Sequence, residues 1–430
     1  MGRGRFVIAL LCIAAAAFLG RAVYILTVTR DQTRSYDELF YKSEATSFVN
    51  GDGFEPSYFG VHFLGSGEHP PLTALVLAPA AALIGDNEVA MLMTIALAGG
   101  GAVAVIGLLG REVAGPRSGL IAAGIAAVYP NLWINDALLL PETLAALATA
   151  AALLFAYRLM RAPGWRYAAL LGLSCAVAAL SRGELVLLLP VLAIPATLLI
   201  KDLAWTRRLR LAGVIVLVSA VVVAPWQAFL LSRFEKPSFI SYGDGGVVAG
   251  ANCDATYSGF LVGFWLGLCR PERLSREPSV AAEQKRNLGR EYMRDHLGRL
   301  PIVVAARVGR MWSVYGPFQM ARFGVAEGKP RWASLAGFWT FWPLIGLAAA
   351  GVIVVRRRGS SLLPLLAPLV IVTLVAALFY GLVRFRVPAE VSIVVLAAAA
   401  LDAAVMRIRR PDRPRLGDAV TSPKATRAPA

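Results

Sequence analysis

The sequence predicts an all-helical protein that crosses a membrane many times. Hydrophobic residues make up 57% of the 430 residues, and the mean hydropathy is +0.62. Apolar stretches long enough to cross about 30 Å of hydrocarbon recur along the chain. Lys and Arg residues are concentrated in alternate connecting segments, as in multi-pass proteins. A soluble domain does not have this composition.

About ten apolar stretches are predicted to be transmembrane helices, judged by length. The first follows the basic sequence Met1 to Arg5, and we interpret it as a retained anchor rather than a cleaved signal peptide. The predicted helices are 6–28, 88–110, 118–134, 142–160, 166–182, 184–200, 210–230, 335–355, 361–381 and 388–406.

The distribution of basic residues predicts the orientation, because short basic segments stay in the cytoplasm. With the N-terminus inside, nearly half of the 43 Lys and Arg residues fall in predicted cytoplasmic segments. The first outer segment, 29–87, has three basic residues but eight acidic ones. We therefore expect both termini to be cytoplasmic.

Two predicted extracytoplasmic segments are large, 29–87 and 231–334. Residues 71–85 are apolar, but a span there would reverse every later connection and place Arg111 outside. We interpret 71–85 as a helix lying along the outer interface. The mixed charge and apolar spacing of 281–311 predict further interfacial helices.

The chain is expected to consist of a membrane module, 1–406, and a basic cytoplasmic tail, 407–430. From Pro411 the tail is rich in Pro, Arg and Ala, a composition that predicts disorder. The net charge of +16 could suggest nucleic acid, but topology and attraction to anionic lipids explain it better. We expect membrane lipids and no nucleic acid among the partners.

The four cysteines fall into two groups. Cys12 and Cys175 lie within predicted spans and are expected to be packing residues. Cys253 and Cys269 share the second outer segment, where the compartment permits a disulfide, and we predict that they form one. No His or further Cys lies near them at ligand spacing, which argues against a metal site there.

Four arginines at the predicted outer side are not explained by the orientation rule. They are Arg21, Arg182, Arg384 and Arg386. In one interpretation they snorkel to the interface or pair with Glu184 and Glu390. In the other they form a basic pocket for a lipid phosphate, which the fixed fork of donors in Arg suits well.

Acidic residues are predicted on the same side of the membrane. Asp37 and Glu38 follow the first span, and Asp136 and Glu142 belong to the turn between the third and fourth. A solvated loop acid or a helix N-cap explains Asp136 and Glu142 equally well. Asp37 is the stronger candidate for a catalytic residue, because a carboxylate opposite arginines can deprotonate a hydroxyl while a phosphate leaves.

A series of short motifs follows one another along the chain, and the resemblance that they carry covers roughly residues 6–400. It comprises Asp37 after the first span, His69-Pro-Pro-Leu72, Gly85-Asp-Asn-Glu88, an acid in the turn before the fourth span, Leu180-Ser-Arg-Gly183 and Arg384-Phe-Arg-Val-Pro388. This series resembles the dolichyl-phosphate-mannose protein mannosyltransferase family. More narrowly, it is similar to that family's bacterial relatives, which include aminoarabinose lipid A transferases.

The resemblance implies a GT-C glycosyltransferase fold, a location in a bacterial plasma membrane, and a sugar donor linked to polyprenyl phosphate that is used on the extracytoplasmic face. By this resemblance the family's acceptor-activating Asp corresponds to Asp37. Glu142 stands where members carry a second acid, and Arg182 where they commonly have Lys or Arg. The loop Asn252 to Gly259 corresponds to no acceptor class, so the acceptor stays open.

The predicted reaction is an inverting single displacement by a hexosyl- or pentosyltransferase, with a glycan, lipid or protein hydroxyl as acceptor. Asp37 and Glu38 are the predicted catalytic residues, and Asp37 is the general base. Polyprenyl phosphate leaves, and arginines stabilise its charge. The predicted substrate-binding residues are His69, Asp136, Glu142, Arg21, Arg182, Arg384 and Arg386. Asp37 and Glu142 are the candidate ligands if Mg²⁺ or Mn²⁺ is required.

Two other classes of protein stay open. A transporter or flippase for lipid-linked sugars could also have a cavity lined by Arg, but it should carry polar residues near the midplane of several spans. The second, third, eighth and ninth predicted spans are nearly devoid of them. A non-catalytic protein of envelope assembly would tolerate the loss of every outer acid, so neutralising Asp37 separates it from an enzyme.

Overall fold

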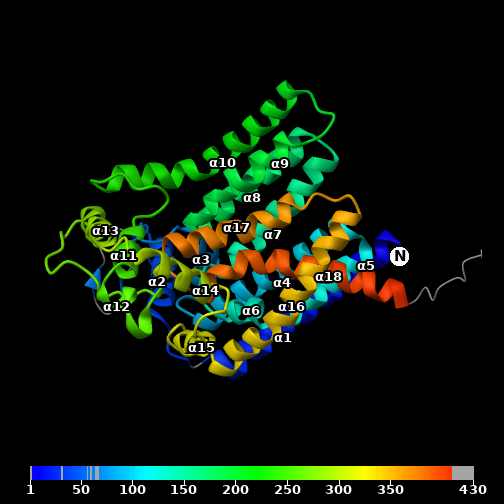
Figure 1. Ribbon diagram of the computed structural model, residues 1–430. Coiled ribbons are helices and arrows are strands. Elements are labelled where there is room, and N and C mark those ends of the chain that lie inside the picture. The colour runs from blue at the N-terminus through cyan, green and yellow to red at the C-terminus, as the bar shows by residue number, and fades with distance from the viewer. Residues whose placement is uncertain (1, 31, 56, 59–60, 63–66, 409–430) are drawn as a thin grey trace, which may run out of the picture.

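The computed structural model describes residues 2–408 except 31, 56, 59–60 and 63–66. Long helices run together as a bundle, and shorter helices gather at one end of it (Figure 1). The described strands are β1 (Ser57–Tyr58) and β2 (Val61–His62), which pair antiparallel. The tail 409–430, which we expected to be disordered, lies outside the described residues.

Every predicted span corresponds to helical structure. The first is α1 (Arg3–Tyr24), which continues through one π-helical turn (Ile25–Thr29). The others are α4 (Glu88–Ala114), α5 (Pro116–Val128), α7 (Glu142–Arg161), α8 (Trp165–Ser181), the turns Gly183–Leu187 and Leu189–Ala193 with α9 (Ile194–Leu198), α10 (Trp205–Arg233), α16 (Arg331–Arg357), α17 (Leu363–Leu378) and α18 (Val387–Ile408).

Among the described residues, six helical segments are long and apolar enough to cross a membrane. They are Arg3–Thr29, Glu88–Ala114, Glu142–Arg161, Trp205–Arg233, Arg331–Arg357 and Val383–Ile408. The remaining segments at predicted spans are shorter apolar helices. The chain is a multi-pass membrane protein, and the number of about ten crossings, set by span length, stays a prediction.

Helix α18 lies at the centre of the bundle. Every residue from Val387 to Ala400 is buried, and the helix packs against α16, α5, α7, α17 and α4. A helix that is apolar on all sides belongs in a protein core or in lipid, and α18 lies in the core. Gly351 on α16 lets the two backbones approach, because a Cβ there would come within 2.0 Å of the Leu396 carbonyl oxygen. The N-terminus of α18 is therefore rigidly placed.

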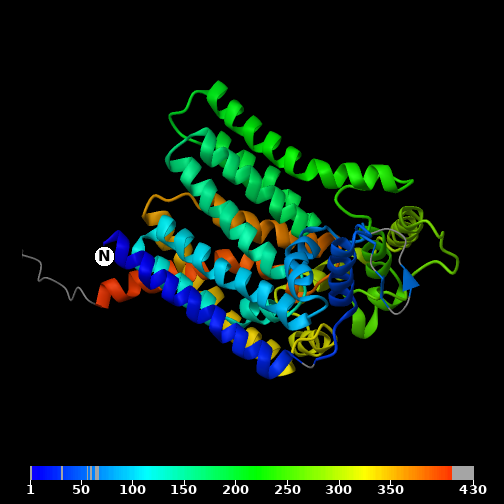
Figure 2. The same cartoon turned by 180° about the vertical axis from the view of Figure 1, so that it is seen from behind.

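The connections predicted to be cytoplasmic meet at one end of the bundle. Arg161 Nη1 lies 2.6 Å from Glu112 Oε1, and Arg358 Nη1 donates to the Ala114 carbonyl at 2.6 Å. Arg358 Nη2 also lies 3.2 Å from Asp402 Oδ2. The N-terminus and the end of α18 lie at this same end (Figures 1 and 2). An even number of crossings requires this arrangement.

The first outer segment lies at the opposite end. It contains α2 (Tyr36–Asn50), the β1–β2 pair and α3 (Leu72–Ile84). The apolar residues 71–85 thus form a short helix, which packs against α2 and α4. Asn87 caps α4 by accepting from the Ala90 amide at 3.1 Å, a typical N-cap contact.

The second outer segment is a set of short helices beside the first (Figure 2). They are α11 (Asp244–Ala251), α12 (Asp254–Tyr257), the turn Gly259–Leu261, α13 (Pro278–Asp295), α14 (Leu300–Met311) and α15 (Pro317–Ala326). The run 281–311 forms most of α13 and α14, and α13 packs on α11. The turns α6 (Pro130–Trp133), Ile134–Ala137 and Val383–Arg386 lie between bundle helices.

Two buried arginines of α14 hold the second outer segment together, and one of them, Arg307, also fastens it to the bundle. Arg307 donates to the Ala377 carbonyl at the end of α17 (3.3 Å) and to the Ala251 carbonyl at the end of α11 (2.6 Å). Arg310 donates to the Val262 carbonyl at 2.6 Å. Cations favour the carbonyl ends of helices, which explains how these side chains are buried without an acidic partner.

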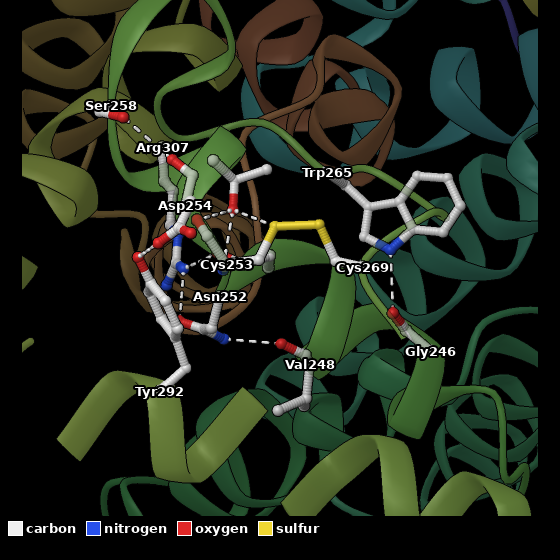
Figure 3. The surroundings of a disulfide bond; sticks show 12 residues. Gly246, Val248, Asn252, Cys253, Asp254, Ser258, Trp265, Cys269, Tyr292 and Arg307 are labelled. Carbon is white, nitrogen blue, oxygen red and sulfur yellow. Dashed lines mark hydrogen bonds between the residues drawn. A yellow bond between two sulfur atoms is a disulfide. The ribbon is translucent and has the colours of Figure 1, made fainter. Parts of the chain in front are cut away.

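Cys253 and Cys269 are joined by a disulfide in this segment (Figure 3). Their Cα atoms are 6.2 Å apart. Beside the bond, Asn252 Oδ1 accepts from the Tyr257 hydroxyl at 2.7 Å and from Arg307 Nη2 at 2.9 Å. The disulfide thus closes a loop that Arg307 ties to the bundle.

Single cysteines test the orientation in a Cys12→Ser/Cys175→Ala background. Glu272→Cys should react with a membrane-impermeant maleimide on intact cells, because the second outer segment is expected outside. Arg117→Cys and Arg357→Cys should react only after permeabilisation. Labelling of Arg117→Cys on intact cells would reverse the orientation.

A thiol count tests the disulfide. The denatured, unreduced protein should show two free thiols and the reduced protein four. Replacing both Cys253 and Cys269 by Ser should lower the melting temperature, because closing a loop of this length is worth roughly 3 kcal/mol. Cys12→Ser/Cys175→Ala is the control and should show no thiol before reduction. Four thiols in unreduced wild type would disprove the bond.

Candidate functional site

The two adjacent carboxylates at the start of α2 point to different neighbours. Glu38 is fully buried and accepts from the Ser35 amide at 2.9 Å and the Leu139 amide at 3.2 Å. It therefore caps α2 and ties it to the loop before α7. Asp37 instead faces Arg384 and keeps 29% of its side chain exposed.

Asp37 forms an ion pair with Arg384, which is 347 residues away in the sequence. Arg384 Nη1 and Nη2 both donate to Asp37 Oδ2, each at 3.1 Å. Arg384 lies on the turn Val383–Arg386, directly before α18. His69 completes the surroundings: its Nε2 lies 4.0 Å from Asp37 Oδ1, and its ring packs against Tyr41. The site thus joins both ends of the chain.

A second arginine is held by two acids. Arg182 Nη1 lies 2.6 Å from Glu142 Oε1, and its Nε lies 2.6 Å from Glu184 Oε1. Glu142 is fully buried at the N-terminus of α7, where the helix dipole favours a negative charge. Its Oε1 also lies 3.8 Å from Arg384 Nε. Glu142 therefore connects the two arginines.

Two residues of the site were not predicted from the sequence. Glu327 Oε1 lies 3.4 Å from Arg384 Nε, and Glu327 Oε2 accepts from Lys329 Nζ at 3.0 Å. Both lie in the turn between α15 and α16, where Gly328 adopts φ +80°. Charged residues are common in outer loops, so the charges of Glu327 and Lys329 did not distinguish this pair. The sequence signal that could have found it is the turn Glu-Gly-Lys-Pro directly before a span.

These contacts form one continuous charge network at the outer end of the bundle. Its members are Asp37, Glu142, Glu184, Glu327, Arg182, Arg384 and Lys329. Four carboxylates thus face three cations. Every cation has at least one acidic partner, which is the condition for keeping such groups away from water.

Burial and neighbouring charges act in opposite directions on the pKa values of the network. Burial alone would raise the pKa of Asp37, but Arg384, His69 and Arg182 outweigh it and lower the pKa. Glu327 behaves in the same way, because Lys329 and Arg384 outweigh its burial and lower its pKa. Both side chains are therefore carboxylates at neutral pH.

Arg21 and Asp136 form a separate buried pair. Arg21 Nε donates to Asp136 Oδ2, and Thr143 Oγ1 donates to Asp136 Oδ1 at 2.7 Å. Gly99 makes room for this carboxylate, because a Cβ there would lie 2.3 Å from Asp136 Oδ2. In the described part of the chain neither side chain contacts the charge network, so the roles in substrate binding predicted for them stay predictions.

Arg386 is also directed away from Asp37. Its Nε donates to Glu390 Oε1 at 2.6 Å, and its Nη1 donates to the Met311 carbonyl at 3.0 Å. The Tyr129 hydroxyl donates to Glu390 Oε2 at 2.9 Å. Arg386 thus has the acidic partner that one interpretation of the sequence assigned to it. Arg384, two residues earlier, faces the charge network instead.

A pocket adjoins Arg384 between α15, the start of α16 and the turn before α18. It has an empty volume of about 630 Å³ including its open mouth. Its polar lining comprises Asn131, Asn135, Ser313, Glu327, Lys329, Ser334, Arg384 and Arg386. Phe338 and Met320 contribute to its apolar wall. Arg384 therefore lies between this pocket and Asp37.

The arrangement does not suit a divalent cation. Within the described ranges, no group of three or more His, Cys, Asp or Glu side chains is placed to hold a metal ion. The two candidate ligands, Asp37 and Glu142, are each paired with a guanidinium group. The positive charge beside these acids comes from arginine side chains, and no step of the reaction is assigned to a metal.

A protein-family model matches part of the chain. Residues 68–229 match the model described as dolichyl-phosphate-mannose-protein mannosyltransferase. This region contains His69, Glu142 and Arg182 but neither Asp37 nor Arg384. The search of curated proteins found no match.

Solved structures of archaeal oligosaccharyltransferases share the fold. The apo oligosaccharyltransferase of Archaeoglobus fulgidus is 15% identical, with a TM-score of 0.57, over 93% of this chain and 51% of that one. Archaeoglobus fulgidus AglB with an inhibitory peptide and a dolichol-phosphate is 14% identical, with a TM-score of 0.52, over 95% and 52%. ArnT from Cupriavidus metallidurans bound to undecaprenyl phosphate is 15% identical, with a TM-score of 0.46, over 95% and 80%.

The chain spans about half the length of the archaeal oligosaccharyltransferases that it matches. At these identities the likeness concerns the fold. The chain is a multi-pass membrane protein with the GT-C fold of the archaeal oligosaccharyltransferases, and its residues 68–229 are similar to the dolichyl-phosphate-mannose-protein mannosyltransferases.

Proposed function

We propose that the chain is a membrane glycosyltransferase that moves a sugar from a polyprenyl-phosphate-linked donor to an acceptor hydroxyl outside the cytoplasm. The observation that carries the proposal is the pair of Asp37 and Arg384, a partly exposed carboxylate in direct contact with a guanidinium group. One group of this kind can take a proton, and the other can stabilise a phosphate. The dolichol-phosphate complex of AglB supports the donor class.

The proposed reaction is one displacement at the anomeric carbon. Asp37 accepts the proton of the acceptor hydroxyl as its oxygen forms a bond to the anomeric carbon. The bond from that carbon to the phosphate oxygen breaks, and polyprenyl phosphate leaves with the electron pair. The configuration inverts because the acceptor attacks from the opposite face. Arg384, with Arg182 behind it, stabilises the charge that develops on the phosphate.

The other acids of the site have positioning roles in this proposal. Glu142 contacts both arginines and keeps them at one place. Glu38 holds the start of α2, and so directs Asp37, through its bonds to the Ser35 and Leu139 amides. His69 lies beside Asp37 and borders the path of the acceptor. A hexose or pentose donor and a glycan, lipid or protein acceptor all fit this chemistry, and glycan profiling of cells lacking the protein would identify them.

Asp37→Asn tests the assignment of the base. The change keeps the size of the side chain but removes its basicity, so transfer should fall by roughly 10²- to 10⁴-fold, the usual contribution of general base catalysis. Donor binding should persist, because both arginines are unchanged. Asp52→Asn, an exposed acid after the same helix, is the matched control. Near wild-type transfer by Asp37→Asn would place the base elsewhere, whereas absence of any transfer by the purified wild-type protein would favour a transporter or an assembly protein.

The pH dependence of kcat/KM tests the contact with Arg384. Asp37 acts as a carboxylate, and its pKa is lowered in the folded protein, so activity should persist below the usual titration range of Asp. In Arg384→Gln the acid limb of the pH profile should move to higher pH. Burial raises the pKa of Asp37, and this variant lacks the main charge that opposes that effect. Arg182→Gln should move it less, since Arg182 contacts Glu142. If the acid limb of the pH profile lies at the same pH in wild type, Arg384→Gln and Arg182→Gln, the assignment of Asp37 as the base is contradicted.

A further inference from the structure

We propose that Glu327 is an internal stand-in for the donor phosphate: its carboxylate occupies the place between Lys329 and Arg384 where the phosphate binds, and it moves aside when the donor enters. This inference rests on the proposed function and goes beyond it, because it assigns an anion site to residues outside the predicted set. The ligand is the phosphate group of a lipid-linked sugar.

The geometry of Glu327 resembles that of a bound phosphate. One carboxylate oxygen faces Lys329 Nζ at 3.0 Å and the other faces Arg384 Nε at 3.4 Å. Two oxygens on one anionic group, each directed at a different cation, is also how phosphate is held. Arg384 Nε is buried and has no hydrogen-bond partner, so a better-placed oxygen would gain a bond there.

The charges around the pocket explain why an acid must leave first. Lys329, Arg384 and Arg386 line the pocket, and Glu327 is the acid that lines it with them. Arg386 is already paired with Glu390. With Glu327 in place the two remaining cations are compensated, so an entering phosphate would meet a carboxylate. Without Glu327 at that point, Lys329 is available to a phosphate, and the Nε side of Arg384 faces only the Glu142 carboxylate at 3.8 Å.

Glu327 is the acid of the charge network that lines the pocket, and it lies on a loop between two helices. Glu142 is fully buried at the start of α7, Asp37 belongs to the first turn of α2, and Glu184 belongs to the turn Gly183–Leu187. Glu327 lies on the turn after α15, beside Gly328, and its side chain is 19% exposed. A rotation of this side chain towards the pocket mouth needs no movement of a bundle helix.

The exchange has a consequence for turnover. The donor is a phosphodiester with one negative charge, whereas the lipid phosphate that leaves is a monoester with a charge of about −1.5 to −2 near neutral pH, by analogy with other phosphate monoesters. The product would therefore be held more tightly than the donor. The return of Glu327 to Lys329 and Arg384 competes with the product and promotes its release.

The test measures binding of farnesyl phosphate, a short isoprenyl phosphate, to the full-length protein in detergent. Glu327→Gln keeps the shape of the side chain and removes the competing charge, so its affinity should rise by roughly tenfold over wild type, as expected for one charge-assisted contact. Lys329→Gln should lower the affinity by about the same factor. Glu283→Gln is the matched control, because Glu283 pairs with Lys236 at 3.1 Å outside the pocket. Melting temperatures verify that each variant is folded.

Equal or weaker binding of farnesyl phosphate by Glu327→Gln would overturn the stand-in role. Binding of farnesol and of inorganic phosphate separates the contribution of the isoprenyl chain from that of the phosphate group. If Glu327→Gln binds inorganic phosphate more tightly but not farnesyl phosphate, the site belongs to free phosphate and the lipid assignment is overturned. If no variant binds farnesyl phosphate, the donor class of the proposed function is wrong as well. If Glu327→Gln binds more tightly while Asp37→Asn keeps full transfer, the anion site stands and the assignment of the base falls.

Discussion

The ion pair between Asp37 and Arg384 determines how the outer end of this protein is organised. It joins the first outer segment to the turn before α18, the central helix of the bundle. Charged groups at the edge of a membrane are costly unless they are paired, so each member of the network needs its partners in place. Arg182, Glu142 and Glu327 are held near Arg384 for this reason. The site is therefore an extension of the packing of α18.

Arginine has two distinct uses in this fold. Arg307, Arg310 and Arg386 are the largest fully buried side chains among the residues that the structure describes. Arg307 donates to carbonyls of α11 and α17, and Arg386 donates to the Met311 carbonyl at the end of α14, so these two join the outer helices to the bundle. Arg310 donates to the Val262 and Phe260 carbonyls within the second outer segment. Arg182 and Arg384 instead share the acid Glu142, and Arg384 also lines the pocket. Carbonyl partners thus distinguish the structural arginines from the two that share acids.

A site that binds an anion must be stable without it. Several arginines at one place would repel one another, and four carboxylates remove this repulsion. The same carboxylates weaken binding of the ligand, because an ion pair between an acid and a cation must break before phosphate can pair with that cation. Placing one of these acids on a loop rather than on a helix solves both problems, since the loop acid stabilises the protein and can still be displaced. Glu327 has this position between α15 and α16.

The sequence by itself determined the helical membrane class and the positions of the spans, because hydropathy and length are local properties of the chain. It also indicated Asp37, Arg182 and Arg384 as residues of one outer face, since orientation follows from the distribution of charge. Only the tertiary structure decided the partners. Arg384 and Arg386 are two residues apart, yet one faces Asp37 and the other faces Glu390. Glu38 caps a helix beside Asp37, and Glu327 with Lys329 belongs to the site although both lie on a loop. Such pairings depend on contacts between segments hundreds of residues apart, and no local pattern records which of many similar charges will meet.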